Sequence, residues 1–124
     1  MKTLLEVFKD VAAAKPVDEA YDVSPKGIML LRNKLSDKGH PVTHIVLARD
    51  VWQKFFKDPL IHQVVEPVSE EEVRQGTACI MYGMIVTTDA ILEGERIIPD
   101  GTMAVVSLAG PRMPYEVYAA KAKL

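Results

Sequence analysis

The residues of this sequence that are best suited to chemistry are its histidines, one cysteine and an aspartate that follows an apolar run. His40 and His44 are four residues apart, the spacing at which two histidines on one face of a helix bind a metal ion. Pro41 and the β-branched residues after it disfavour a helix at this point. In an extended chain the two rings lie roughly 13 Å apart, at about 3.3 Å per residue, too far to share an ion. We therefore predict no metal site.

Cys79 and Asp89 belong to the most continuous apolar stretch of the chain, Gly76–Leu92. A cysteine inside an apolar strand is usually an inert small hydrophobe, and no neighbour in the sequence would lower its pKa. Asp89 is an acceptable catalytic carboxylate, but an aspartate at a strand end more often accepts hydrogen bonds from the following turn. A small enzyme, one alternative, would need Asp89, His62 and Cys79 in one cleft. No phosphate-binding loop, dinucleotide-binding glycine pattern or nucleophile elbow occurs, so we predict no catalytic residue, no cofactor and no enzymatic activity.

The composition fits one domain, because the chain has 124 residues and 48% of them are hydrophobic. A formal net charge of -2 argues against a general nucleic-acid binder, which usually has a basic excess. No run of about 18 apolar residues occurs, so we expect no transmembrane helix and no membrane partner. The single cysteine excludes an internal disulfide and is typical of a reducing compartment or of a particle assembled there.

The first half of the chain predicts two longer helices and a strand that must position these residues. An amphipathic helix is expected at residues 3–14, where it packs either on its own domain or on a neighbour. Ser24 and Pro25 begin a second helix, which ends at Gly39. The β-branched segment Thr43–Ala48 then predicts a strand.

Three aromatic residues follow that strand on a short predicted helix, Val51–Lys57. Trp52, Phe55 and Phe56 could form a binding platform, and a protein-binding or regulatory module that uses this surface is a second alternative. On so short a helix we favour core packing or a subunit contact. The next segment, Leu60–Val65, is apolar and predicted to be extended.

Four carboxylates gather around a short predicted helix, Glu70–Gln75. They belong to Glu66, Glu70, Glu71 and Glu72. Acidic residues at the start of a helix are favourable to the helix dipole, which accounts for them in structural terms. The alternative is an acidic rim at a pore or a subunit contact.

The second half of the chain predicts mostly strands. Gly83 separates two short apolar strands, Ala78–Tyr82 and Met84–Thr88, and we expect it to bend the chain. Another strand is predicted at Thr102–Leu108, and a last edge strand begins near Tyr115.

These elements predict a single α+β domain with a small mixed central sheet of about four strands, flanked by helices. We assign residues 1–15 to the N-terminal amphipathic helix, 16–23 to a connector, 24–118 to the main domain and 119–124 to a tail that frays.

The order of four segments is similar to that of a known family. They are the helix end Lys38–Pro41, the strand and short helix Thr43–Phe55, the glycine-centred pair Gly76–Ile91 and the strand Gly101–Ser107. Together they resemble the axial, or A, domain of the Hong Kong 97-type major capsid protein of tailed phages, over about residues 24–108. A full capsid subunit also carries an N-terminal arm, an extended loop and a peripheral domain, so the chain resembles the A domain alone.

The resemblance implies a structural, self-assembling protein of a phage virion or of a capsid-like, encapsulin-like shell, located in the virion or in a shell assembled in the cytoplasm. It implies a homo-oligomer or binding to other virion or shell proteins, and no small-molecule substrate. By analogy, the contact segments are Trp52–Pro59, Glu66–Glu72 and Asp89–Asp100. The subunit contacts expected within them are Trp52, Phe55, Phe56, Glu70, Glu71, Asp89, Glu93 and Arg96.

Overall fold

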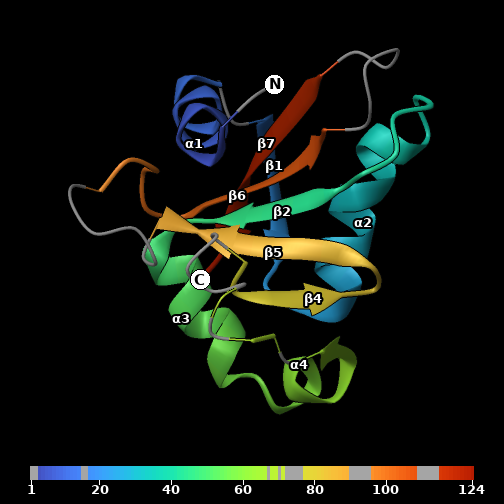
Figure 1. Ribbon diagram of the computed structural model, residues 1–124, viewed down its shortest axis with the longest axis vertical. Coiled ribbons are helices and arrows are strands. Elements are labelled where there is room, and N and C mark those ends of the chain that lie inside the picture. The colour runs from blue at the N-terminus through green and yellow to red at the C-terminus, as the bar shows by residue number, and fades with distance from the viewer. Residues whose placement is uncertain are drawn as a thin grey trace.

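A computed structural model of the chain describes residues 3–14, 17–66, 68–69, 71, 77–89, 96–108 and 115–124. In this part of the chain, four helices accompany one mixed sheet of seven strands (Figure 1). In chain order the elements are α1 (Leu4–Ala13), β1 (Val17–Asp22), α2 (Pro25–Ser36), β2 (His44–Leu47), α3 (Arg49–Lys57), α4 (Pro59–Val64), β3 (Val65–Glu66), β4 (Cys79–Met81), β5 (Met84–Thr88), β6 (Thr102–Ser107) and β7 (Glu116–Lys123).

The strands lie in the order β1-β7-β6-β2-β5-β4-β3. Two neighbouring pairs, β1 with β7 and β2 with β5, are parallel, and the other neighbours are antiparallel. At the centre, Ile45 of β2 is opposite Val86 of β5 and Val105 of β6, so these three side chains share one face. Because β2 and β5 are parallel, their carboxyl ends meet at the same edge, where the polar residues described below lie.

The prediction of a small α+β domain with a mixed sheet is confirmed, but the expected number of about four strands is wrong. The predicted connector at 16–23 contains β1, whose sequence is rich in charges as befits the edge of a sheet. The strand expected near Tyr115 lies inside the sheet, between β1 and β6, and it continues to Lys123. Residues 119–123 therefore pair with neighbouring strands instead of fraying.

The segment predicted to be extended after residue 59 is mostly helical. Asp58 and Pro59, which look like a helix breaker, begin α4 instead: the Asp58 carboxylate accepts a hydrogen bond from the Leu60 amide at 2.9 Å. An aspartate before a proline at the first helical position is an ordinary helix start. Only Val65 and Glu66 are extended, as β3.

Other helix ends agree with the sequence signals. The Thr3 hydroxyl accepts a hydrogen bond from the Glu6 amide at the start of α1, and the Ser24 hydroxyl accepts one from the Gly27 amide in α2. The buried face of α1, which includes Phe8, packs against β7, so this helix belongs to its own domain.

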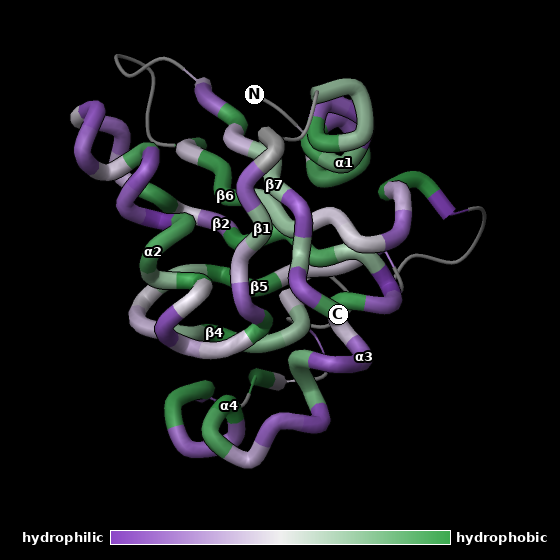
Figure 2. The backbone as a smooth tube through the Cα atoms, turned by 180° about the vertical axis from the view of Figure 1, so that it is seen from behind, coloured by the Kyte–Doolittle hydropathy of each residue, from purple (hydrophilic) through white to green (hydrophobic). Residues whose placement is uncertain are grey.

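Helices cover both faces of the sheet near its centre. All six residues of β6 are buried, and because side chains alternate along a strand, both faces of β6 must be covered. α2 packs against β1, β6 and β7. The main contact of α1 with the sheet is with β7. Figures 1 and 2 show these two helices on either side of the β6–β7 pair.

Gly27 allows α2 to approach β1 at backbone distance. A Cβ atom at this position would lie 2.0 Å from the carbonyl oxygen of Asp22, the last residue of β1. Real Cβ atoms essentially never approach another atom so closely, so a glycine is required for this packing of helix on strand.

Candidate functional site

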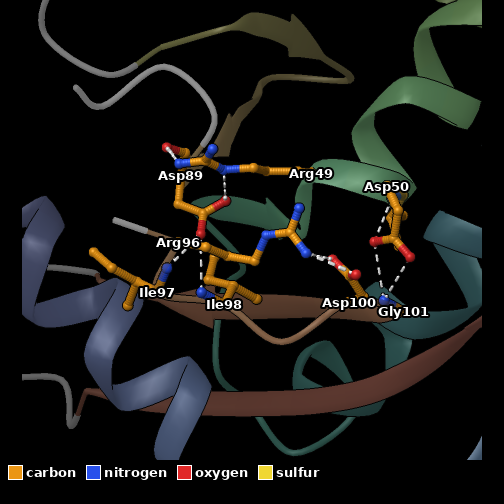
Figure 3. Close-up of polar contacts among 9 residues, drawn as sticks. Arg49, Asp50, Asp89, Arg96, Ile97, Ile98, Asp100 and Gly101 are labelled. Atoms are coloured by element: carbon orange, nitrogen blue, oxygen red, sulfur yellow. Dashed lines mark hydrogen bonds and ion pairs between the residues drawn. The ribbon is translucent and has the colours of Figure 1, made fainter. Parts of the chain in front are cut away.

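Polar side chains gather where the parallel strands β2 and β5 end, the edge at which sheets of α/β proteins often place their ligand sites. Arg49 and Asp50 follow β2, and Asp89 follows β5. Figure 3 shows them close to Arg96 and Asp100, on the chain that leads into β6. These carboxylates and arginines are therefore the first candidates for a catalytic or binding site.

Asp89 uses its carboxylate to fix the backbone that leads into β6. Its side chain is fully buried, and Oδ2 accepts hydrogen bonds from the amides of Ile97 and Ile98 at 2.8 and 2.9 Å. Oδ1 lies 3.6 Å from Nε of Arg49, whose Nη2 also donates to the backbone carbonyl of Asp89 at 3.4 Å. The buried charge is compensated by an arginine and two amides, which is the usual condition for burying a carboxylate.

Asp50 holds the turn before β6 in a similar way. Its two carboxylate oxygens lie 2.9 Å from the Gly101 amide nitrogen, and Oδ1 also accepts a hydrogen bond from the Val51 amide. On the surface beside it, Nη1 of Arg96 lies 2.7 Å from each of the two carboxylate oxygens of Asp100. These acidic groups are therefore committed to the backbone or to a neighbouring cation, and the arrangement positions a loop instead of presenting a general acid or base.

The three residues that an enzyme would have to bring together are used separately. Asp89 binds the two amides, and Nε2 of His62 lies 2.6 Å from the carbonyl oxygen of Phe56. Cys79 is buried, and burial raises the pKa of its thiol to about 12, so it stays protonated at neutral pH. Within the described ranges, no group of three or more His, Cys, Asp and Glu side chains is placed to hold a metal ion.

A second feature, which we call the aromatic surface, lies on α3 and α4. It consists of Trp52, Phe56 and His62, whose rings contact one another. The ring of Trp52 lies 5.3 Å from that of Phe56, and Phe56 meets His62 edge to face at 5.0 Å. Phe56 is 52% exposed and Leu60 is 57% exposed, whereas Trp52 is half-buried.

The buried residue Phe55 connects the aromatic surface to the hydrophobic core. Phe55 is fully buried, and its ring stacks on Trp52 at a centroid distance of 5.5 Å. Lys54 and Lys57 lie exposed on the same helix, and Nζ of Lys54 donates to the Lys123 carbonyl of β7 at 2.9 Å. The result is a small apolar area with cations beside it, built on helices that the core holds in place.

The expected contact residues fall into three groups. Trp52, Phe56, Glu71 and Arg96 reach the surface, although Trp52 does so only in part and Arg96 is paired with Asp100. Phe55 and Asp89 are fully buried, so neither side chain is available for the contacts predicted for them: one fills the core and the other binds backbone amides. Glu70 and Glu93 lie outside the described residues.

Sequence reasoning missed Leu60 and His62, because the segment that contains them was predicted to be extended. Asp58 before Pro59 was the signal for a helix, and on this helix the His62 ring contacts Phe56 of α3. The role of Asp50 in holding the Gly101 turn had no local signal, because the two residues are 51 positions apart.

A shallow groove of about 410 Å³ lies between β1 and the first turns of α2. Its charged side chains are largely matched with opposite charges, as in the pair of Lys123 with Asp22 at 3.8 Å. Exposed pairs of this kind contribute little energy and indicate no particular ligand. In the described part of the chain, no helix is long and apolar enough to cross a membrane.

No protein-family model, no curated protein and no solved structure matches this chain.

Proposed function

We propose that this protein is a structural, non-enzymatic component that self-assembles, as part of a phage virion or of a capsid-like shell. The observation that carries this proposal is the aromatic surface, where Phe56 is more than half exposed beside Trp52. Exposed apolar patches rimmed by polar residues typically mark interaction sites, and interface hot spots are enriched in tryptophan and other large anchors near their centre.

Two further observations support a structural role. The carboxylates at the ends of β2 and β5, the most favourable place for a catalytic group, bind backbone amides or arginine side chains. The sequence pattern of residues 24–108, which resembles a capsid A domain, supports a shell as the setting. In such a setting the partner of the aromatic surface is another copy of this chain or a second shell protein.

A head-to-tail contact is the arrangement that suits a shell. When one surface of each copy binds a different surface of the next, rotation closes the assembly into a ring. A stable contact of this kind buries about 800 Å² on each partner, with a few anchoring side chains contributing most of the free energy. Phe56 is such an anchor, because it projects from a helix that Phe55 fixes in the core.

The test is light scattering coupled to gel filtration over a range of protein concentrations. We expect the wild-type protein to form oligomers, and Phe56→Ser to raise the dissociation constant about 30-fold or more, as for loss of a hot spot of about 2 kcal/mol. Gln53→Ser, at an exposed polar position on the same helix, is the matched control and should assemble normally. A wild-type protein that stays monomeric at high concentration contradicts self-assembly and favours the binding-module alternative.

A further inference from the structure

His62 contacts Phe56 in two ways at the corner between α3 and α4. Nε2 of its imidazole lies 2.6 Å from the backbone carbonyl oxygen of Phe56, and the two rings meet edge to face at a centroid distance of 5.0 Å. A single residue, Asp58, separates the two helices. One exposed histidine on the short second helix is therefore joined to both the backbone and the side chain of Phe56.

The local sequence leaves the Phe56 carbonyl for a side chain to satisfy. In a continuing helix this oxygen would accept a hydrogen bond from the amide four residues later, that of Leu60. The Leu60 amide instead donates to the Asp58 carboxylate at 2.9 Å, and Pro59 has no N–H. Within the described residues, no backbone amide beyond α3 donates to the Phe56 carbonyl. Because a carbonyl oxygen only accepts, Nε2 of His62 must carry the hydrogen, and the imidazole supplies the missing donor.

The ring of Phe56 is held between two other rings. It is 52% exposed, so solvent leaves part of it without packing partners. On one side it contacts Trp52 at 5.3 Å, and Trp52 stacks in turn on the buried ring of Phe55. On another side it contacts His62. The rings form a chain from the core to the surface, and His62 is its outer end.

We propose that His62 is a positioning residue, which holds the ring of Phe56 against Trp52 and so preorganises the aromatic surface for binding. A side chain that is already fixed loses less conformational entropy when a partner covers it, which raises the affinity without a new contact. This inference rests on the proposed function, in which the aromatic surface is the binding site, and it adds how that site is held ready.

Replacing His62 tests whether it fixes Phe56. His62→Ala removes the donor and the ring, and alanine favours the helix. We expect NMR three-bond couplings of the Phe56 side chain to change from those of one χ1 rotamer to averaged values, while cooperative urea unfolding shows that the fold is kept. Trp52 is the only tryptophan of the chain, so a weaker near-ultraviolet circular dichroism of its ring reports the same release.

Two further variants complete this test. Gln63→Ala, at another exposed position of α4, is the matched control and should change neither signal. His62→Gln keeps an N–H donor but no ring, and it should release the ring of Phe56 as His62→Ala does. If Phe56 keeps a single rotamer in both His62 variants, the proposal is overturned.

Self-association distinguishes this inference from the proposed function. In light scattering we expect His62→Ala to raise the dissociation constant about threefold to tenfold, less than Phe56→Ser, because the Phe56 ring remains and only its ordering is lost. A variant that releases Phe56 but assembles with the wild-type dissociation constant overturns preorganisation and leaves self-assembly standing. A monomeric wild-type protein overturns self-assembly, and the couplings measured on that monomer then decide whether His62 positions Phe56.

Discussion

At the scale of single residues, Asp89 shows how a side chain that looks catalytic serves the fold. Its carboxylate replaces water for two amides, those of Ile97 and Ile98, and balances its charge against Arg49. An asparagine at this position would keep one oxygen for the two amides, but its NH2 group would face Arg49 in place of Oδ1, which leaves the arginine without its negatively charged partner.

We therefore predict that Asp89→Asn lowers the free energy of unfolding by about 2 kcal/mol at neutral pH, measured by urea denaturation. The matched control is Asp100→Asn. Asp100 also pairs with an arginine, Arg96, but both side chains are 52% exposed, so the loss should stay below about 1 kcal/mol. Equal effects of the two substitutions would contradict the structural role of Asp89.

His44 makes the stability of the fold depend on pH. Burial lowers the pKa of its half-buried ring below the usual 6.5. In the unfolded chain the ring takes up a proton near pH 6.5, whereas in the folded chain it does so only at lower pH. The contribution of His44 to stability is therefore complete above pH 6.5 and is lost as the pH falls through the folded-state pKa.

We predict that His44→Gln loses less stability than the wild type between pH 7.5 and pH 5, measured by urea denaturation at each pH. His62→Gln, at an exposed histidine, controls for the loss of an imidazole elsewhere in the fold. Parallel curves for the wild type and His44→Gln would show that burial of this ring has no such effect.

At the scale of elements, local signals predicted what they control directly. Thr3 and Ser24 begin helices through hydrogen bonds with residues three positions away, so the sequence was sufficient to place α1 and α2. β1 and β7 could not be paired in the same way, because their parallel register joins Tyr21 to Ala122 across almost the whole chain. From the sequence alone, the charged segment β1 resembles a loop, and it forms a strand by pairing with β7.

Gly27 provides a case in which local propensity and packing predict opposite signs. Alanine in place of glycine inside an exposed helix normally stabilises by about 0.5 to 1 kcal/mol. Here the added Cβ would meet the Asp22 carbonyl at 2.0 Å, and backbone atoms on both sides cannot simply move aside. We predict that Gly27→Ala lowers the free energy of unfolding by about 3 kcal/mol, by urea or thermal denaturation.

The control for that substitution is Asn33→Ala, at an exposed position of the same helix. It should change the free energy of unfolding by only about a few tenths of a kcal/mol. If Gly27→Ala stabilises the protein instead, the close packing of α2 on β1 is incorrect.

At the scale of the whole molecule, the aromatic surface leaves Phe56 more than half exposed on a helix that the core holds in place. The sequence was sufficient to indicate Trp52 and Phe56 as surface candidates, because three aromatic residues exceed what one short helix can bury. It could not separate them from Phe55, which the helix turns into the core, and it gave no sign that Tyr82 has a positive φ. Both facts depend on the three-dimensional path of the chain.

Electron microscopy of the native particles tests the proposed self-assembly most directly. We predict closed rings or shells in which α3 of each copy lies against the neighbouring copy, with Phe56 at the centre of the contact. Phe56→Ser, which leaves the core intact, should abolish these particles. A field of isolated monomers at high concentration, or particles in which Phe56 faces solvent, would contradict this account.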